Sequence, residues 1–149
     1  MRTCLLGVVL LAALAPAQMP AAREVEAELD KLKGTWSLVS EIDDGKELSA
    51  EEARKIKLTF DGDGKWKVEV DGKMVGEGTT ALNPSTRPKT LEYTFTGGEQ
   101  KGARFLAVYE LDGDTFRHCG ALKGDRPTEF ASKPGSGHSL TTFRRDKKE

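Results

Sequence analysis

The feature that most constrains this fold is a two-residue alternation of apolar and polar side chains that recurs along most of the chain. In segments 55–60 and 65–70, apolar residues occupy every second position, with lysine, threonine or glutamate between them. Successive side chains of a β-strand point to opposite faces, so this pattern predicts strands with one buried face. The same interpretation applies to segments 36–42, 73–82, 91–95, 105–111, 116–122 and 138–145.

Short glycine-containing turns join most of these segments. Asp61-Gly62-Asp63-Gly64, Asp71-Gly72, Gly97-Gly98 and Asp112-Gly113-Asp114 are typical of β-hairpins, which place consecutive strands side by side and antiparallel. Eight such strands without helical crossovers predict an all-β, up-and-down antiparallel barrel, because closure removes exposed edges. A two-sheet sandwich stays open as an alternative, since alternation does not show closure.

A short helix is expected before the first strand. Val25, Leu29 and Leu32 have helical spacing among charged residues from Arg23 to Lys33, and a glycine then favours the helix end. Trp36 follows that glycine at the start of the first strand. Because indole buries a large area, we expect Trp36 to have a structural role, closing the barrel end against the helix.

The first residues predict export. Residues 1–17 combine a positive start, an uncharged apolar run from Leu5 to Leu14, and small residues at Ala15 and Ala17, which is the pattern of a cleaved signal peptide. A cut after Ala22 is the alternative. The apolar run is too short to span a bilayer as a helix. We therefore expect a periplasmic, cell-envelope or extracellular protein with a single domain over 23–145 and a polar tail over 146–149.

Charge and residue types argue against several functions. The chain has 23 Lys and Arg against 24 Asp and Glu, so no basic face for nucleic acid is expected. Signal cleavage would leave Cys119 as the one cysteine, which excludes an intrachain disulfide. No catalytic residue, metal ligand or cofactor is predicted, because no nucleophile, base and orienting group can be placed together. The assignment therefore leans against an enzyme, and we expect a monomer.

Several motifs in order resemble one known family. They are LKGTW (Leu32–Trp36), PKTL (Pro88–Leu91), YELDGDT (Tyr109–Thr115), DRPTEF (Asp125–Phe130) and SKPGSG (Ser132–Gly137). Together they are similar to a family of exported lipocalin-like domains found mainly in planctomycetes. This resemblance implies the barrel fold and export, and it implies no activity or catalytic residue.

Mixed sizes among the inward residues leave two functions open. Where small residues cluster, an eight-stranded barrel has room for one small molecule. The candidate ligand-binding residues are Gly76, Gly78, Tyr93, Tyr109 and His118. The leading hypothesis is binding of a small apolar or amphipathic molecule. The alternative is a non-catalytic module for protein–protein contacts in the cell envelope, with a filled barrel.

Two further expectations concern single residues. In the loop DRPTEF, Arg126 and Glu129 are expected to be structural, tying the loop to the barrel by an ion pair, and the alternative is that the arginine binds an anion at the barrel mouth. His118 shares a face with Phe116, Gly120 and Leu122, so burial should lower the pKa of its imidazole. We expect the imidazole to be neutral and hydrogen-bonded to Tyr109.

Overall fold

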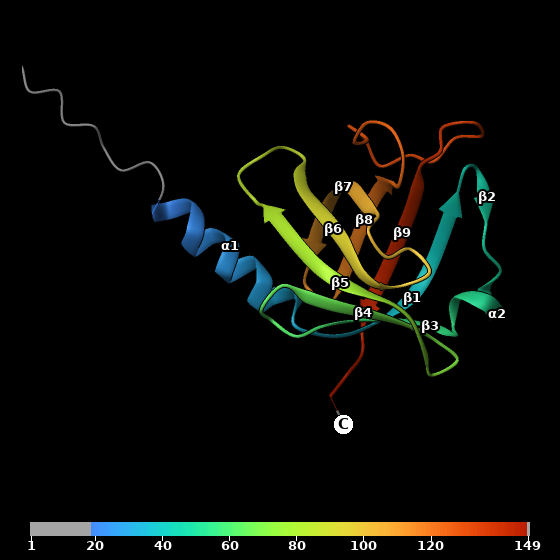
Figure 1. Ribbon diagram of the computed structural model, residues 1–149, viewed down its shortest axis with the longest axis horizontal. Coiled ribbons are helices and arrows are strands. Elements are labelled where there is room, and N and C mark those ends of the chain that lie inside the picture. The colour runs from blue at the N-terminus through green and yellow to red at the C-terminus, as the bar shows by residue number, and fades with distance from the viewer. Residues whose placement is uncertain (1–18, 149) are drawn as a thin grey trace, which may run out of the picture.

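The computed structural model describes residues 19–148, and its central feature is a closed antiparallel barrel (Figure 1). Each long strand pairs with the next, and β1 also pairs with β9, which closes the sheet. The predicted eight-stranded barrel is thereby confirmed over the sandwich. The strands are β1 (Gly34–Asp43), β3 (Ile56–Phe60), β4 (Lys65–Val70), β5 (Lys73–Asn83), β6 (Lys89–Gly98), β7 (Arg104–Asp112), β8 (Thr115–Ala121) and β9 (Ser139–Arg145).

Three short elements accompany the barrel. Helix α1 (Met19–Leu32) leads into β1 and extends away from one end of the barrel (Figure 1). The two-residue strand β2 (Lys46–Glu47) pairs with the end of β1 and was not predicted. Helix α2 (Ala50–Ala53) begins at a capping box, in which the Ser49 hydroxyl accepts from the Glu52 backbone N–H. Among the described residues, no helix has the length and apolar character needed to cross a membrane.

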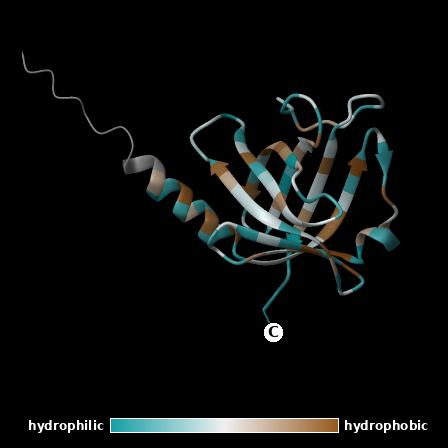
Figure 2. Ribbon diagram, viewed as in Figure 1, coloured by the Kyte–Doolittle hydropathy of each residue, from teal (hydrophilic) through white to brown (hydrophobic). Residues whose placement is uncertain are grey.

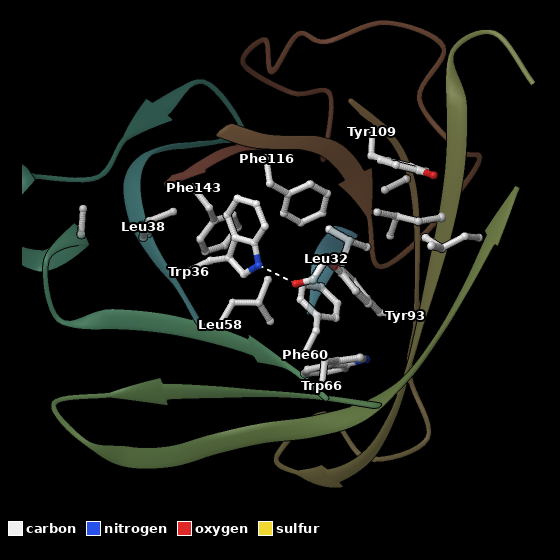
Figure 3. Close-up of a cluster of buried hydrophobic side chains, with 14 residues drawn as sticks. Leu32, Trp36, Leu38, Leu58, Phe60, Trp66, Tyr93, Tyr109, Phe116 and Phe143 are labelled. Atoms are coloured by element: carbon white, nitrogen blue, oxygen red, sulfur yellow. Dashed lines mark hydrogen bonds between the residues drawn. The ribbon is translucent and has the colours of Figure 1, made fainter. Parts of the chain in front are cut away.

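The barrel end beside α1, called here the helix end, is closed by Trp36. Its side chain is fully buried, and its indole Nε1 donates a hydrogen bond of 2.7 Å to the carbonyl of Leu32, the last residue of α1 (Figure 3). The Arg145 guanidinium lies 4.1 Å from the centroid of the Trp36 ring and donates to the carbonyls of Lys31 and Lys33. The tryptophan therefore joins the helix to the first strand, and β9 covers it.

Large side chains fill the helix half of the barrel by packing against small ones. Aromatic rings from several strands meet there, including Phe60, Phe116 and Tyr93 (Figure 3). A Cβ added at Gly78 would lie 1.9 Å from the Thr94 carbonyl oxygen and 2.8 Å from the Trp66 ring. Such interlocking is the ordinary solution for a dense core. Figure 2 shows hydrophobic and hydrophilic residues mixed along the strands of the barrel.

A β-bulge changes the inward set near the end of β1. The β1–β9 register pairs Leu38 with Phe143 and then Ser40 with Thr142, so Val39 is an extra residue. Continued alternation from Trp36 would turn Ile42 inward. The bulge instead aligns Glu41 with the buried Thr141, and the carboxylate enters the barrel.

The structure tests the expectation for the C-terminus but not the one for the N-terminus. The predicted signal segment 1–17 lies outside the described residues. Asp146, expected at the start of the polar tail, is held against the barrel: its carboxylate accepts from Ser37 Oγ and, at 2.7 Å, from Lys57 Nζ. Its backbone N–H donates to the Thr35 carbonyl at 2.8 Å.

Candidate ligand pocket

A cavity of about 320 Å³ lies inside the barrel at the end opposite α1, and we call it the lumenal pocket. Trp66, Tyr93 and Phe143 line it on the side of the filled half. Its walls are largely apolar, with contributions from Ile56, Leu58, Val68, Val70, Phe95 and Phe105. The barrel is therefore filled at the helix end and hollow at the other.

One wall of the lumenal pocket carries a row of polar side chains. In the strand register, His118 of β8 lies opposite Thr141 of β9, and Thr141 lies opposite Glu41 of β1. All three line the cavity. Because directly opposed residues on one face are close neighbours, the row presents an imidazole, a hydroxyl and a carboxylate side by side.

His118 lies where the filled half meets the cavity. The residue is 6% exposed, and its ring centroid lies between 5.3 and 5.7 Å from those of Phe116, Phe105, Phe143 and Tyr93. Its Nδ1 is buried and has no hydrogen-bond partner among the described residues. Burial lowers the pKa of His118 to about 3, as expected from its apolar surroundings.

The expected hydrogen bond between His118 and Tyr109 is wrong. Tyr109 Oη donates instead to Glu28 of α1, at 2.9 Å. Although Tyr109 pairs with His118 in the register, its hydroxyl reaches the helix end, away from the imidazole. Leu122, expected on the inward face, is 43% exposed because β8 ends at Ala121.

The predicted ligand-binding residues divide between the two halves of the barrel. Gly76, Tyr93 and His118 line the lumenal pocket. Gly78 does not, because the Trp66 ring and the Thr94 backbone occupy the space beside it. Tyr109 belongs to the helix end. The Tyr93 hydroxyl is also buried without a hydrogen-bond partner among the described residues, and burial raises its pKa.

Tyr109 takes part in a buried charge cluster at the helix end. The Glu28 carboxylate accepts from Tyr109 and forms ion pairs with Lys31 at 3.0 Å and Lys89 at 3.1 Å. Burial works to raise the pKa of Glu28, but the hydrogen bonds from Lys31, Lys89 and Tyr109 outweigh it and lower the pKa. This cluster anchors α1 to β6 and β7.

Sequence reasoning missed Glu41 as a pocket residue. Its carboxyl pKa is raised, first by burial and then by the nearby charge of Asp43. The local signal was a break in the alternation, where Leu38 and Val39 are two adjacent apolar residues. Such a break is a sign of a bulge, which shifts the later side chains to the opposite face.

The loop between β8 and β9 is tied to the outer wall, by contacts other than those expected. Glu129 pairs at 3.8 Å with Lys133 of the same loop, and within residues 19–148 neither Arg126 nor Glu129 forms an ion pair with the barrel. The Cys119 thiol donates to the Ala131 carbonyl at 3.4 Å, and the Arg117 guanidinium lies 4.5 Å from the Phe130 ring centroid. β8 side chains that point away from the pocket thus hold one part of the loop, and the turn after β1 holds another, since Gly45 N donates to Ser132 Oγ at 3.1 Å and Gly137 N to Asp44 Oδ1 at 2.8 Å.

Comparisons with known proteins add no identification. No protein family matches the chain, and neither the curated proteins nor the solved structures yield a match. Across residues 19–148, no group of three or more His, Cys, Asp and Glu side chains is placed to hold a metal ion. The class of protein that the structure defines is a lipocalin-like barrel with a partly hollow, aromatic interior.

Proposed function

We propose that this protein is exported and, as a monomer, binds a small amphipathic molecule in the lumenal pocket. The observation that carries the proposal is the largely apolar cavity of about 320 Å³, one wall of which carries the polar row of Glu41, Thr141 and His118. A ligand with an apolar body and one hydrogen-bonding group would fill the cavity and place that group against the row.

The size of the cavity limits the ligand. Pockets for small molecules begin at about 300 Å³, and the lumenal pocket, at about 320 Å³, stands at this lower limit. A short alkyl chain or a single small ring system therefore suits the pocket better than a large lipid does.

An uncharged alcohol tests the proposal directly. We expect titration with octanol to change the fluorescence of Trp66, which lines the pocket, and the change to persist in Trp36→Phe, which removes the indole at the helix end. Gly76→Leu should abolish the response by placing its side chain in the pocket, since a Cβ at this position makes only ordinary contacts, at 3.7 Å from the Phe95 ring and 3.8 Å from the Trp66 ring.

Thr79→Leu is the matched control, since Thr79 lies on the same strand with an exposed side chain. This variant should bind octanol as the unmodified protein does. Absence of binding to the unmodified protein, by fluorescence and by native mass spectrometry of the exported protein, would overturn the proposal. Binding that survives Gly76→Leu would place the ligand elsewhere.

The alternative interaction module has less support. It required a filled barrel, and the cavity of about 320 Å³ does not fit that condition.

Export has its own test: the mass of the mature protein should correspond to a chain beginning at Gln18, or at Arg23 for the alternative cut. A mass that retains residues 1–17 would contradict export by cleavage.

A further inference from the structure

Glu41 is the one charged residue among those that line the lumenal pocket. It is there because the bulge at Val39 shifts the alternation of β1 and turns this side chain inward. No lysine or arginine lines the cavity. The charge available to a ligand inside the barrel is therefore negative.

The Glu41 carboxylate has no protein partner to compensate it. Within residues 19–148, its side chain forms neither a hydrogen bond nor an ion pair. The residue is half-buried, and burial raises its pKa, which reflects the cost of keeping a charge partly out of water. Burying a charge is favourable only when a counter-charge or hydrogen bonds accompany it.

The neighbours of Glu41 offer hydrogen bonds and no positive charge. Thr141 separates Glu41 from His118 along the polar row. The imidazole is neutral near pH 7, because burial lowers its pKa to about 3. A carboxylate ligand would meet Glu41 with no cation to balance the two like charges, whereas an ammonium group would supply the missing counter-charge.

We infer that the lumenal pocket selects amphiphiles with a protonated amine head group, which Glu41 binds as a counter-ion while the apolar walls hold the carbon chain. This inference rests on the proposed function and specifies its ligand class. A charge-assisted hydrogen bond is roughly twice as strong as a neutral one, so the head group should dominate discrimination between ligands of equal chain length.

The test compares octylamine, octanol and octanoate, which share one carbon chain. Calorimetric titration at about pH 8 keeps the amine protonated and the Glu41 carboxyl ionised. We expect octylamine to bind about tenfold more tightly than octanol, and octanoate to bind more weakly than both. Glu41→Gln should remove the preference for the amine, so that octylamine and octanol bind this variant with similar affinity.

Glu47→Gln is the matched control, because Glu47 is exposed on β2 and makes the same change of charge outside the pocket. It should retain the preference. Equal binding of all three compounds, or tightest binding of octanoate, would overturn the amine inference and leave the proposed function standing. Failure of all three to bind would instead overturn the proposed function. A preference that survives Glu41→Gln would show that another group recognises the amine.

Discussion

Tyr109 and Glu28 are 81 residues apart in the chain, yet the Tyr109 hydroxyl donates a 2.9 Å hydrogen bond to the Glu28 carboxylate at the helix end of the barrel. This bond links β7 to α1. It also shows that the two buried tyrosines of the interior differ, because the Tyr93 hydroxyl has no partner among the described residues.

Loss of the hydroxyl should change the free energy of unfolding differently at the two tyrosines. Tyr109→Phe removes a hydrogen bond to a buried charge, so we expect the free energy of unfolding to fall by about 1.5 kcal/mol. Tyr93→Phe removes an unpartnered polar group and should be neutral or stabilising. Urea denaturation followed by tryptophan fluorescence measures both. Equal losses would show that Tyr93 has a partner in solution.

His118 should make the protein sensitive to mild acid. Its pKa falls from about 6.5 in the unfolded chain to about 3 in the fold, so the unfolded chain binds a proton first as the pH decreases. The stabilisation from the neutral ring is complete above about pH 6.5 and is lost as the pH falls toward 3, with a slope of at most about 1.4 kcal/mol per pH unit.

His118→Gln should remove this part of the slope, which unfolding experiments at several pH values would measure. In the unmodified protein, an NMR titration should leave the His118 ring neutral down to about pH 4, given its pKa of about 3. A midpoint near 6.5 would place the ring in solvent and contradict its position in the pocket wall.

Two inward glycines of β5 should tolerate alanine differently. A Cβ at Gly78 would lie 1.9 Å from a backbone oxygen of β6, so Gly78→Ala should destabilise the fold by about 1–3 kcal/mol through overpacking. At Gly76 the nearest atom is a Phe95 ring carbon at 3.7 Å, an ordinary contact. Gly76→Ala should change the free energy of unfolding by less than about 1 kcal/mol. Similar losses at both sites would contradict the division of the barrel into filled and hollow halves.

Full stability of the helix end should require an arginine, and not a lysine, at position 145. It stacks on Trp36 and donates to two carbonyls at the end of α1, and a lysine cannot reproduce this planar, multiple contact. Arg145→Lys should lower the free energy of unfolding by about 1–2 kcal/mol and speed hydrogen exchange in the last turn of α1. Its exposed neighbour provides the control, since Arg144→Lys should change neither quantity.

The barrel could be predicted because the signals for each strand lie within the strand and the turns beside it. Alternation and glycine turns are local, so the strands and their hairpins could be placed without knowledge of distant contacts. The pairing of β1 with β9 has no local signal, and the sandwich therefore stayed open until the register of these strands was known.

The pocket was predictable only in part, because knowing that a side chain points inward does not show whether it lies in the filled half of the barrel or in the hollow half. Gly76, Tyr93 and His118 line the cavity, and alternation alone predicts their inward face. Tyr109 and Gly78 also face inward, but the Tyr109 hydroxyl reaches the helix end and the Trp66 ring covers Gly78. These positions depend on side chains of other elements, which alternation within one strand does not show. Glu41 was missed because a single extra residue reverses the alternation that follows it.

Closure through β1 and β9 also determines when the barrel can be completed. Every other pair of long strands joins neighbours in the chain, whereas this pair joins the first strand to the last. Until β9 emerges, the growing sheet has an unpaired edge on β1 and another on its newest strand, and such edges are templates for association with other chains. The two edges therefore disappear together, when β9 pairs with β8 on one side and with β1 on the other.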